Sequence, residues 1–352
     1  MINKIINAIN LHYGGGKTYM YLMHSFLDKD NNFLILDYRF KQNYIHFKNA
    51  KIIFIRKSLF RNLQIFIIRY YFYLRYFHAY NKNKNDLNKF TEIYLNGIPP
   101  LIRFRNTEVY IFAQNRLIFE DFKSTSFNLN SFKLKLYLFI QRSLLNLFLR
   151  KSDFIIVQTN SMLRLVRKYV TNKIVLQDKL WGKYDLEKFK FIKSNLHDFD
   201  INLIDKIKYL SLNSILFFFP ASFYQYKNHN KLLEAFNLLY KKSSISFKLL
   251  LTLDMNDLKI INNLNLNKPY LICLGKLDYS NVINLYENID YLVFPSLNES
   301  YGLPLIEAGI NNVKIIASDL DYVYEVCRPY LTFDPLSISD IFLKLKMALE
   351  DN

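Results

Sequence analysis

Glycine and cysteine are scarce in this chain of 352 residues. It has 8 glycines, where average usage of about 7% would give roughly 25, so each glycine that remains is more informative than usual. The two cysteines, Cys273 and Cys327, show no CxxC spacing. Two such residues exclude a disulfide framework and a cysteine-based metal site, and they favour a reducing compartment.

Long uncharged hydrophobic runs are also missing. The most tempting stretch, residues 59–80, contains Arg61, Arg69 and Arg75, and three arginines exclude a membrane-spanning helix. The N-terminus lacks the apolar core and small-residue cleavage site of a secretory signal, so we expect a cytoplasmic protein. A composition of 51% hydrophobic and 22% charged residues excludes a disordered or fibrous chain. The length suits about two domains of roughly 150 residues.

Acidic residues are scarce in the first half only. Residues 1–180 contain 29 Lys and Arg against 10 Asp and Glu, a net charge of +19, whereas residues 181–352 contain 18 against 20, a net charge of −2. The overall charge of +17 therefore belongs to the first half. Residues 51–90 have a net charge of +8 and residues 123–173 a net charge of +9.

The basic stretches of the first half alternate with aromatic rings. In the first stretch, Arg56, Lys57, Arg61, Arg69 and Arg75 interleave with Phe60, Phe66, Tyr70, Tyr73 and Phe77. Basic-aromatic helices suit an anionic membrane interface, and a nucleic-acid surface has the same composition. The plainer alternative is an ordinary helix that packs its aromatic rings on the core and leaves its cations in solvent.

The chain alternates short β-rich apolar runs with longer helical patterns. Strands are predicted over 4–11, 32–37, 51–55, 108–113, 153–158 and 173–176, then over 214–219, 247–253, 270–274, 290–294 and 314–317. Helices are predicted over 57–80, 131–151, 161–169, 228–241, 281–288 and 303–310. This alternation is typical of α/β proteins with doubly wound parallel sheets. It predicts domains at 1–180 and 213–352, the second with a terminal helix, joined by a linker region at 181–212.

Three of the eight glycines, Gly14, Gly15 and Gly16, follow the first predicted strand and precede a helical pattern. Glycines at such a turn let backbone amides approach a phosphate at the start of the helix. The residues from Gly16 to Thr18 also have the form of the end of a P-loop. That motif needs a glycine five positions earlier, where Leu11 stands. We favour a ligand-contacting turn, with a plain tight turn as the alternative.

The richest segment combines a buried strand, a polar loop and a helix start, and reads DYLVFPSLNESYGLPLIEAG over residues 290–309. Ligands of open parallel sheets bind at the carboxyl ends of strands, where this loop is expected. Gly302 and the neighbouring amides could hold an anionic group at the helix start. Glu299 and Glu307 suit bidentate contacts to vicinal hydroxyls, because each carboxylate oxygen accepts from a separate hydroxyl.

These residues resemble the signature of family 4 retaining glycosyltransferases of the GT-B fold, whose paired glutamates stand eight apart. Three more stretches resemble parts of that family in the same order. FPASFYQYKNH at 219–229 resembles its phosphate-binding loop, DFIIVQTNS at 153–161 the last core strand and helix start of its N-terminal domain, and Gly14–Gly16 its glycine loop. The resemblance implies two Rossmann-like domains facing across a cleft, and a sugar transferred from a nucleotide-sugar donor.

The resemblance also implies residue roles. Lys227 would neutralise the donor diphosphate, and Glu307 would accept from the ribose hydroxyls of the nucleotide. Glu299 would hold the transferred sugar, which makes Glu299 and Lys227 the expected catalytic residues. The donor-binding set further contains residues of the loop and the helix start, namely Ser300, Tyr301, Gly302 and Leu303.

The chain departs from the family pattern at two positions. Many members carry an arginine five residues before the lysine, where this chain has Ser222, so that diphosphate contact is missing or comes from elsewhere, with Lys276 as the candidate. Many members place a histidine after the fourth N-terminal strand. Asn115 occupies that stretch here and is the candidate sugar or acceptor contact. A transferase-like binding subunit without catalysis therefore stays open.

With a nucleoside diphosphate as leaving group, catalysis is expected to come from positioning and from stabilising the developing phosphate charge. This scheme needs no metal and no cofactor. Asp-x-Asp strings stand at 28–30, 198–200 and 319–321, and three copies in one chain make the string a weak sign of a metal site. The histidines show no metal-ligand spacing, and His229 is expected to be structural.

The expected protein is thus a metal-independent, retaining, hexosyltransferase-like enzyme. The basic half favours a lipid-linked or cell-envelope glycan as acceptor, in polysaccharide biosynthesis at the inner face of the cell membrane, with the protein bound peripherally to anionic lipid. A nucleic-acid-binding protein that uses the basic half is the alternative from another class.

Overall fold

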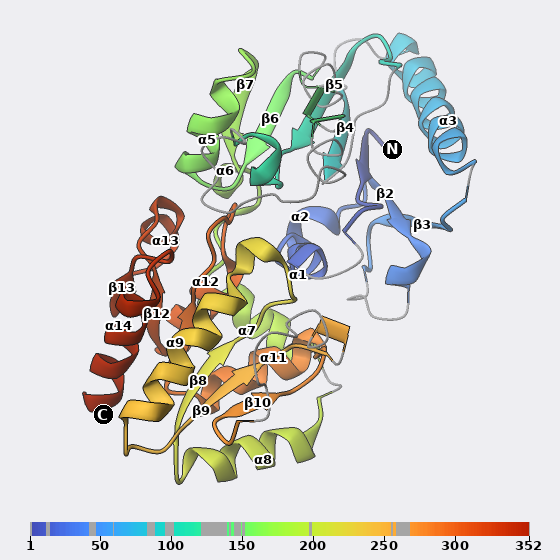
Figure 1. Ribbon diagram of the computed structural model, residues 1–352. Coiled ribbons are helices and arrows are strands. Elements are labelled where there is room, and N and C mark those ends of the chain that lie inside the picture. Colours follow the sequence, from blue (N-terminus) through green and yellow to red (C-terminus); the bar gives the residue numbers. More distant parts are fainter. Residues whose placement is uncertain are drawn as a thin grey trace. The chain divides into compact units, whose positions relative to one another are not determined.

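A computed structural model describes residues 2–11, 15–41, 47–58, 60–82, 89–95, 102–120, 139–140, 142–143, 149, 152–196, 199–254, 256–257 and 268–351. The chain divides into two units, one ending at Lys183 and the other beginning at Tyr184. Each unit is an α/β structure built on one parallel sheet (Figure 1). The 181–212 segment, predicted as a linker region, carries the end of one short helix and two further helices.

The first unit has a seven-stranded sheet in the order β3-β2-β1-β4-β5-β6-β7. Its strands are β1 (Lys4–Asn7), β2 (Asn32–Asp37), β3 (Lys51–Ile55), β4 (Phe90–Leu95), β5 (Thr107–Phe112), β6 (Phe154–Val157) and β7 (Lys173–Leu176). Its helices are α1 (Gly15–Leu22), α2 (His24–Leu27), α3 (Arg61–Lys82), α5 (Asn160–Arg167) and α6 (Asp178–Trp181), with short 3-10 helices η1 (Tyr38–Phe40) and η2 (Arg116–Ile118). The strand order reverses between β1 and β4, which is where open α/β sheets form a ligand crevice.

The second unit has a six-stranded sheet in the order β10-β9-β8-β11-β12-β13. Its strands are β8 (Ile215–Phe219), β9 (Phe247–Leu251), β10 (Leu271–Cys273), β11 (Tyr291–Phe294), β12 (Lys314–Ser318) and β13 (Leu331–Phe333). Its helices are α7 (Leu186–Asn195), α8 (Ile201–Ser211), α9 (His229–Lys242), α11 (Tyr279–Leu285), α12 (Leu303–Ile310), α13 (Asp321–Val326) and α14 (Ile338–Glu350), with η3 (Gln225–Lys227) and η4 (Tyr286–Asn288). The order reverses between β8 and β11.

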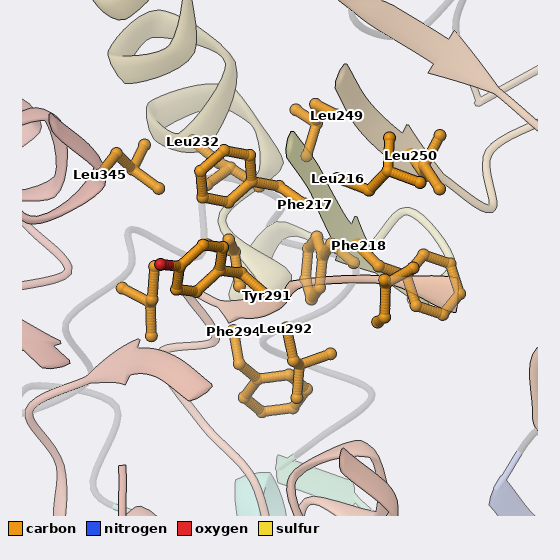
Figure 2. Packing of buried hydrophobic residues seen from close by; sticks show 14 of the residues in the cluster. Leu216, Phe217, Phe218, Leu232, Leu249, Leu250, Tyr291, Leu292, Phe294 and Leu345 are labelled. Carbon is orange, nitrogen blue, oxygen red and sulfur yellow. The ribbon is translucent and has the colours of Figure 1, made fainter. Parts of the chain in front are cut away.

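The centre of the second sheet is almost wholly apolar. Four of the five residues of β8 and all four of β11 are buried, and Figure 2 shows their side chains packed against α9 and the neighbouring strands. The rings of Phe217 and Tyr291 stack with their centroids 5.1 Å apart. The Tyr291 hydroxyl donates to the carbonyl of Ala348 at 2.7 Å, which ties β11 to α14. Each buried side chain of this size contributes roughly 1.5–3 kcal/mol, so this sheet centre is a main source of stability.

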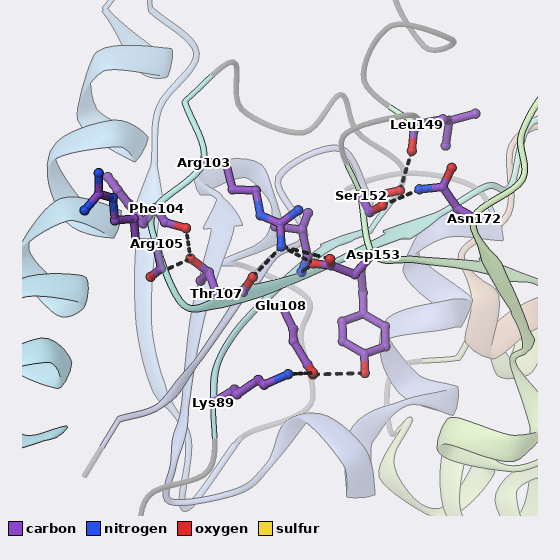
Figure 3. A network of polar contacts seen from close by, with 12 residues as sticks. Lys89, Arg103, Phe104, Arg105, Thr107, Glu108, Leu149, Ser152, Asp153 and Asn172 are labelled. Atoms are coloured by element: carbon purple, nitrogen blue, oxygen red, sulfur yellow. Dashed lines mark hydrogen bonds and ion pairs between the residues drawn. The ribbon is translucent and has the colours of Figure 1, made fainter. Parts of the chain in front are cut away.

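The amino ends of β5 and β6 are joined by a polar network (Figure 3). Arg103 Nη2 donates to both carboxylate oxygens of Asp153, at 2.8 and 2.7 Å. Asp153 Oδ2 also accepts from the amide of Val109 at 2.8 Å, and Lys89 pairs with Glu108 at 3.2 Å. The network therefore braces the edge of the sheet opposite to the one where ligands of parallel sheets bind.

Most predicted elements are confirmed, and the strands at 32–37, 51–55 and 173–176 have the predicted bounds. The strands β4 and β13 were not predicted from the sequence. In β4, FTEIYL, the glutamate interrupts the apolar pattern. The terminal helix of the second domain is confirmed as α14. Most of the helix predicted over 131–151 lies outside the described residues.

The prediction that Arg69 belongs to a basic surface of the first half is wrong, because this arginine is buried and only 1% exposed. Its Nε and Nη2 atoms donate to the two carboxylate oxygens of Glu92 on β4, at 3.0 and 3.1 Å. The Tyr94 hydroxyl donates to Glu92 Oε2 at 2.6 Å. Arg69 therefore neutralises a carboxylate in the core and anchors α3 to the sheet, and it adds no charge to the surface.

Candidate functional site

The candidate site lies at the carboxyl ends of β8 and β11 in the second unit. These strands are hydrogen-bonded neighbours, with Phe217 opposite Tyr291 and Phe218 opposite Leu292. After β8 the next strand, β9, is added on one side of the pair, whereas after β11 the next strand, β12, is added on the other side. The loop after β8 leads to α9 and the loop after β11 leads to α12. This is the topological switch point, where ligands of open α/β sheets bind.

An ion pair joins the two loops. Lys227 Nζ contacts Glu299 Oε1, and the two side chains are 15% and 14% exposed. The ammonium lies 5.4 Å from the ring centroid of Tyr226 and 5.5 Å from that of Phe294. The Leu297 amide donates to the Tyr226 carbonyl at 2.7 Å, which fixes one loop against the other. The structure thus brings together the two residues predicted as catalytic, and their charges neutralise each other.

Both helices of the site start at a residue in the left-handed conformation. Asn228, with φ 62°, precedes α9, and Gly302, with φ 72°, precedes α12. A Cβ added at Gly302 would lie 3.0 Å from Leu305 Cδ1, so both the dihedral and the space favour glycine. Neither helix has a hydrogen bond from the side chain of its N-cap residue. Helix starts of this kind leave first-turn amides for an anionic ligand.

Glu307, in the second turn of α12, is 2% exposed. Its Oε1 accepts from the Tyr279 hydroxyl at 2.6 Å, and its Oε2 accepts from the Tyr286 hydroxyl at 3.0 Å. A third hydroxyl, that of Tyr184, lies 2.9 Å from the Tyr279 hydroxyl. Burial raises the pKa of Glu307 to about 7, although the two hydrogen bonds lower it. The predicted ribose contact thus lies inside a tyrosine cluster.

These three tyrosines were not predicted as site residues from the sequence. Tyr279 and Tyr286 stand seven residues apart in the α11–η4 stretch, which places them on one face of a helical pattern. That spacing was available from the sequence, but nothing in it pointed to Glu307. Tyr184 lies in the stretch predicted as a linker region, which showed no clear periodicity.

The two residues considered for the missing arginine contact are both exposed. Ser222 follows β8 and has an exposed side chain. Lys276 Nζ lies 2.6 Å from Asp254 Oδ2, and that carboxylate raises the pKa of Lys276. Gly275, just before this lysine, has φ 75° and open space around it. Lys276 is therefore held at the ends of β9 and β10 by its own acidic partner.

His229, which was expected to be structural, is the first residue of α9. The side chain is buried between the rings of Phe219 and Phe223, whose centroids lie 4.7 and 5.5 Å away. Burial, followed by the nearby charge of Lys227, lowers the pKa of His229 to about 3. The imidazole is therefore neutral at physiological pH.

In the first unit, Gly15 and Gly16 are the first residues of α1, and Gly14 lies outside the described residues. A Cβ added at Gly16 would lie 3.0 Å from Leu11 Cα, so the helix start closely approaches the backbone of Leu11. Asn115 is exposed, and its Oδ1 accepts from the Leu117 amide at 3.1 Å to cap η2. It follows the fifth strand, so the prediction that it follows the fourth is wrong, because β4 had been missed.

One aspartate of each Asp-x-Asp string holds a backbone or side-chain group. Asp28 accepts from the amides of residues 48–50, and Asp200 caps α8. Asp319 accepts from the Tyr324 hydroxyl at 2.6 Å. Across the part of the chain that the structure describes, no three His, Cys, Asp or Glu side chains gather as a metal site would require.

Comparison with known proteins places residues 200–352 in one family, described as "Glycosyl transferases group 1". The serotype-specific mannosyltransferase WbdA of Escherichia coli is 28% identical to this chain over 132 residues. That match covers 36% of this chain and 16% of the relative, so the chain spans a small part of the length of WbdA.

Several solved structures resemble the chain over nearly its whole length. HepE of Anabaena, in complex with UDP and glucose, has a TM-score of 0.64 at 12% identity. The match covers 100% of this chain and 90% of the HepE chain. A glycosyltransferase from Rickettsia africae has a TM-score of 0.63 at 15% identity, with 99% and 88% covered. WaaG, a glycosyltransferase involved in lipopolysaccharide biosynthesis, has a TM-score of 0.55 at 12% identity, with 99% and 90% covered. At these identities the likeness shows the fold alone.

Proposed function

We propose that the protein is a retaining glycosyltransferase that uses a nucleotide-sugar donor, because residues 200–352 match the group 1 glycosyl transferases and the whole chain has the GT-B fold. The observation that carries the proposal is the ion pair between Lys227 and Glu299 at the β8–β11 switch point. It lies in the loops that lead to the starts of α9 and α12. A donor diphosphate needs a cation and helix amides at one point, and this arrangement offers both.

The ion pair does not have to break when the donor binds. An ammonium has three hydrogens to donate, so Lys227 can keep Glu299 and still donate to a phosphate oxygen. Glu299 would then position the transferred sugar next to the phosphate, with the backbone of Ser300 to Leu303 around it. As the bond to the sugar breaks, negative charge grows on the diphosphate, and Lys227 with the starts of α9 and α12 would stabilise that charge.

The donor test uses a panel of nucleotide sugars with GDP-mannose first, because the curated relative is named a mannosyltransferase. Binding is measured by calorimetry. Lys227→Ala should weaken binding about 10- to 100-fold, because a hydrogen bond to a charged group is worth about 1.5–3 kcal/mol. Lys241→Ala is the matched control, because this exposed lysine lies in the last turn of α9, at the end opposite to the candidate site, and the affinity of this variant should not change. Equal losses in both variants would remove Lys227 from its proposed role.

The proposed enzyme works without a bound metal, because Lys227 and the helix amides supply the positive charge that the leaving group needs. Turnover of the purified protein should survive excess EDTA. Loss of turnover with EDTA and its return with added Mg²⁺ or Mn²⁺ would contradict this part of the proposal.

The acceptor side of the proposal rests on α3, whose outer face is apolar and open to solvent. Large exposed side chains recur at helical spacing along this face, namely Leu63, Ile67, Tyr71, Leu74 and Phe77, and Phe60 just before the helix is also exposed. The inner face, with Ile65, Arg69 and Tyr76, is buried. Arg75 on the helix is exposed, as are Arg56 and Lys57 in the segment that precedes it. An apolar row with cations beside it suits an anionic lipid surface.

The proposed acceptor is therefore a lipid-linked or cell-envelope glycan reached at the membrane surface. No helix in the described ranges is long and apolar enough to cross a bilayer. Binding to vesicles with and without anionic lipid tests this contact. Salt-sensitive binding to RNA or DNA that displaces the protein from such vesicles would favour the nucleic-acid alternative instead.

A further inference from the structure

Two tyrosines bind the same carboxylate but differ in their surroundings. Tyr286 is 1% exposed, belongs to the core of the second unit and meets the ring of Phe218 edge-on at 5.9 Å. Tyr279 is half-buried and is the first residue of α11. Tyr286 is thus a fixed partner of Glu307, whereas Tyr279 lies where the cluster reaches the surface.

The direction of the hydrogen bonds follows from the number of protons. Tyr279 has one hydroxyl hydrogen, which it donates to Glu307 Oε1 at 2.6 Å. In the contact of 2.9 Å between the two hydroxyls, Tyr184 must therefore be the donor and Tyr279 the acceptor. The chain of bonds runs from Tyr184 through Tyr279 to an ionised Glu307, so each hydroxyl strengthens the next bond.

This arrangement closes the carboxylate to a ligand. Glu307 is 2% exposed, and each of its oxygens already accepts a hydroxyl. The vicinal hydroxyls of a ribose are donors of the same kind as a tyrosine hydroxyl, and they need the same oxygen atoms. Each carboxylate oxygen could accept a second hydrogen bond, but Glu307 is only 2% exposed, so a ribose can reach it only if a tyrosine moves away. Tyr279 is the tyrosine of the cluster with accessible surface.

We propose that Tyr279 is a removable cover on Glu307: its hydroxyl occupies Oε1 in the free protein, and a ribose hydroxyl of the bound nucleotide replaces it there. Tyr286 stays on Oε2 and holds the carboxylate in place. Tyr279 is thus a positioning residue that sets how readily the site accepts a ribonucleotide. The inference rests on the proposed function, because it takes the ligand to be a nucleotide.

Exchange of one hydroxyl for another has a measurable consequence. Tyr279→Phe keeps the ring and removes the hydroxyl that competes with the ligand, so binding should tighten by about 3- to 10-fold, the worth of one hydrogen bond. Tyr286→Phe removes the fixed donor in the same chemical way and should weaken binding by a similar factor. The two variants form a matched pair with opposite expected signs.

Calorimetry at pH 8.5, where Glu307 is ionised, would compare the wild type with both variants. The probes are UDP, GDP and ADP, together with the 2′,3′-dideoxy form of whichever nucleotide binds. Wild type should bind the dideoxy form more weakly, and Tyr279→Phe should leave the affinity for that form unchanged. The gain in Tyr279→Phe should appear with the ribonucleotide only.

If Tyr279→Phe binds the ribonucleotide no more tightly than the wild type does, the proposed role of Tyr279 is wrong. If the wild type still binds the ribonucleotide tightly, that result leaves the proposed function standing. Absence of binding of all three nucleotides to the wild type would overturn both. If Tyr279→Phe does not fold, Tyr184→Phe is the second variant, since it removes the bond that holds Tyr279 in place. Tyr184→Phe should tighten ribonucleotide binding about twofold. A loss of affinity in this variant would contradict the proposed role of Tyr279.

Discussion

Glu92 in the first unit and Glu307 in the second are both buried glutamates, yet the two units treat them differently. Glu92 accepts from Arg69 and from Tyr94, so a cation neutralises it inside the core. Glu307 accepts from Tyr279 and Tyr286, which are uncharged. A carboxylate with an arginine is a fixed part of the structure. One held by hydroxyls alone keeps a raised pKa and can exchange a partner, which suits a binding site.

The comparison extends to the helices that precede the fourth strand of each sheet. In the first unit α3 precedes β4 and delivers Arg69 to Glu92. In the second unit α11 and η4 precede β11 and deliver Tyr279 and Tyr286 to Glu307 on α12. The same position in the topology therefore serves anchoring in one unit and the candidate site in the other.

The largest effect is expected from breaking the ion pair of the first unit. Arg69→Met keeps the length and packing of the side chain but leaves Glu92 buried without a cation. Removing one partner of a buried pair costs about 3–5 kcal/mol, so urea unfolding should show the first unit destabilised by that amount. Arg103→Met is the control, because its pair with Asp153 is partly exposed and worth about 1 kcal/mol or less. Equal effects would mean that burial of the Arg69 pair does not matter.

At Glu307 we expect a substitution to stabilise the protein. The folded protein keeps the proton of this carboxyl up to a pH of about 7, against an ordinary value of 4.5, so stability falls as the pH rises between these values. Glu307→Gln removes the titration and should stabilise the second unit by about 2–3 kcal/mol at pH 8, with little change at pH 4.5. Unfolding at the two pH values measures this. A pH-independent effect would show that the raised pKa is not the cause.

A smaller effect separates two glycines of the same helix region. Gly302→Ala puts a Cβ at φ 72° and 3.0 Å from Leu305 Cδ1, and should cost about 1–2 kcal/mol. Gly309→Ala adds a Cβ inside α12 with nothing within 4 Å, and should stabilise by up to about 1 kcal/mol. Thermal unfolding of both variants gives the signs. The same sign for both would mean that the turn at Gly302 is not a strained position.

The smallest effect sharpens the contrast between the surfaces of the two units. Leu63 on α3 and Leu343 on α14 are 55% and 49% exposed. Leu63→Ser should weaken binding to anionic vesicles by about 1 kcal/mol, a factor of about five, because part of an apolar side chain leaves the lipid interface. Leu343→Ser should leave vesicle binding unchanged. Sedimentation with vesicles measures both, and equal losses would argue against a docking face on α3.

Prediction from sequence succeeded where one rule decided the structure. The strands β2, β3 and β7 follow from short apolar runs, and α12 follows from Gly302 with Pro304 in its first turn. The same loop pointed to Glu299, and the 219–229 stretch pointed to Lys227, since both patterns are local in sequence. Their direct contact is a product of strand order, which places the ends of β8 and β11 side by side.

Prediction failed where a long-range contact decided the structure. β4 carries Glu92, which looks incompatible with a central strand until Arg69, 23 residues away, is known to neutralise it. Tyr184 lies 95 residues from Tyr279, and no local pattern connects them. The buried polar clusters of both units therefore could not be predicted from local sequence patterns.

Asn228 gives the scarcity of glycine a structural consequence. Within the described ranges, the non-glycine residues with positive φ are Asn106, Asn228 and Asn312, all asparagines. Asparagine tolerates this conformation, and unlike glycine it brings an amide. Asn228 uses that amide to donate to the carbonyls of Pro295 and Pro335, at 3.3 and 2.8 Å. Asn228 thus adopts a conformation usual for glycine and at the same time joins three loops through its side chain.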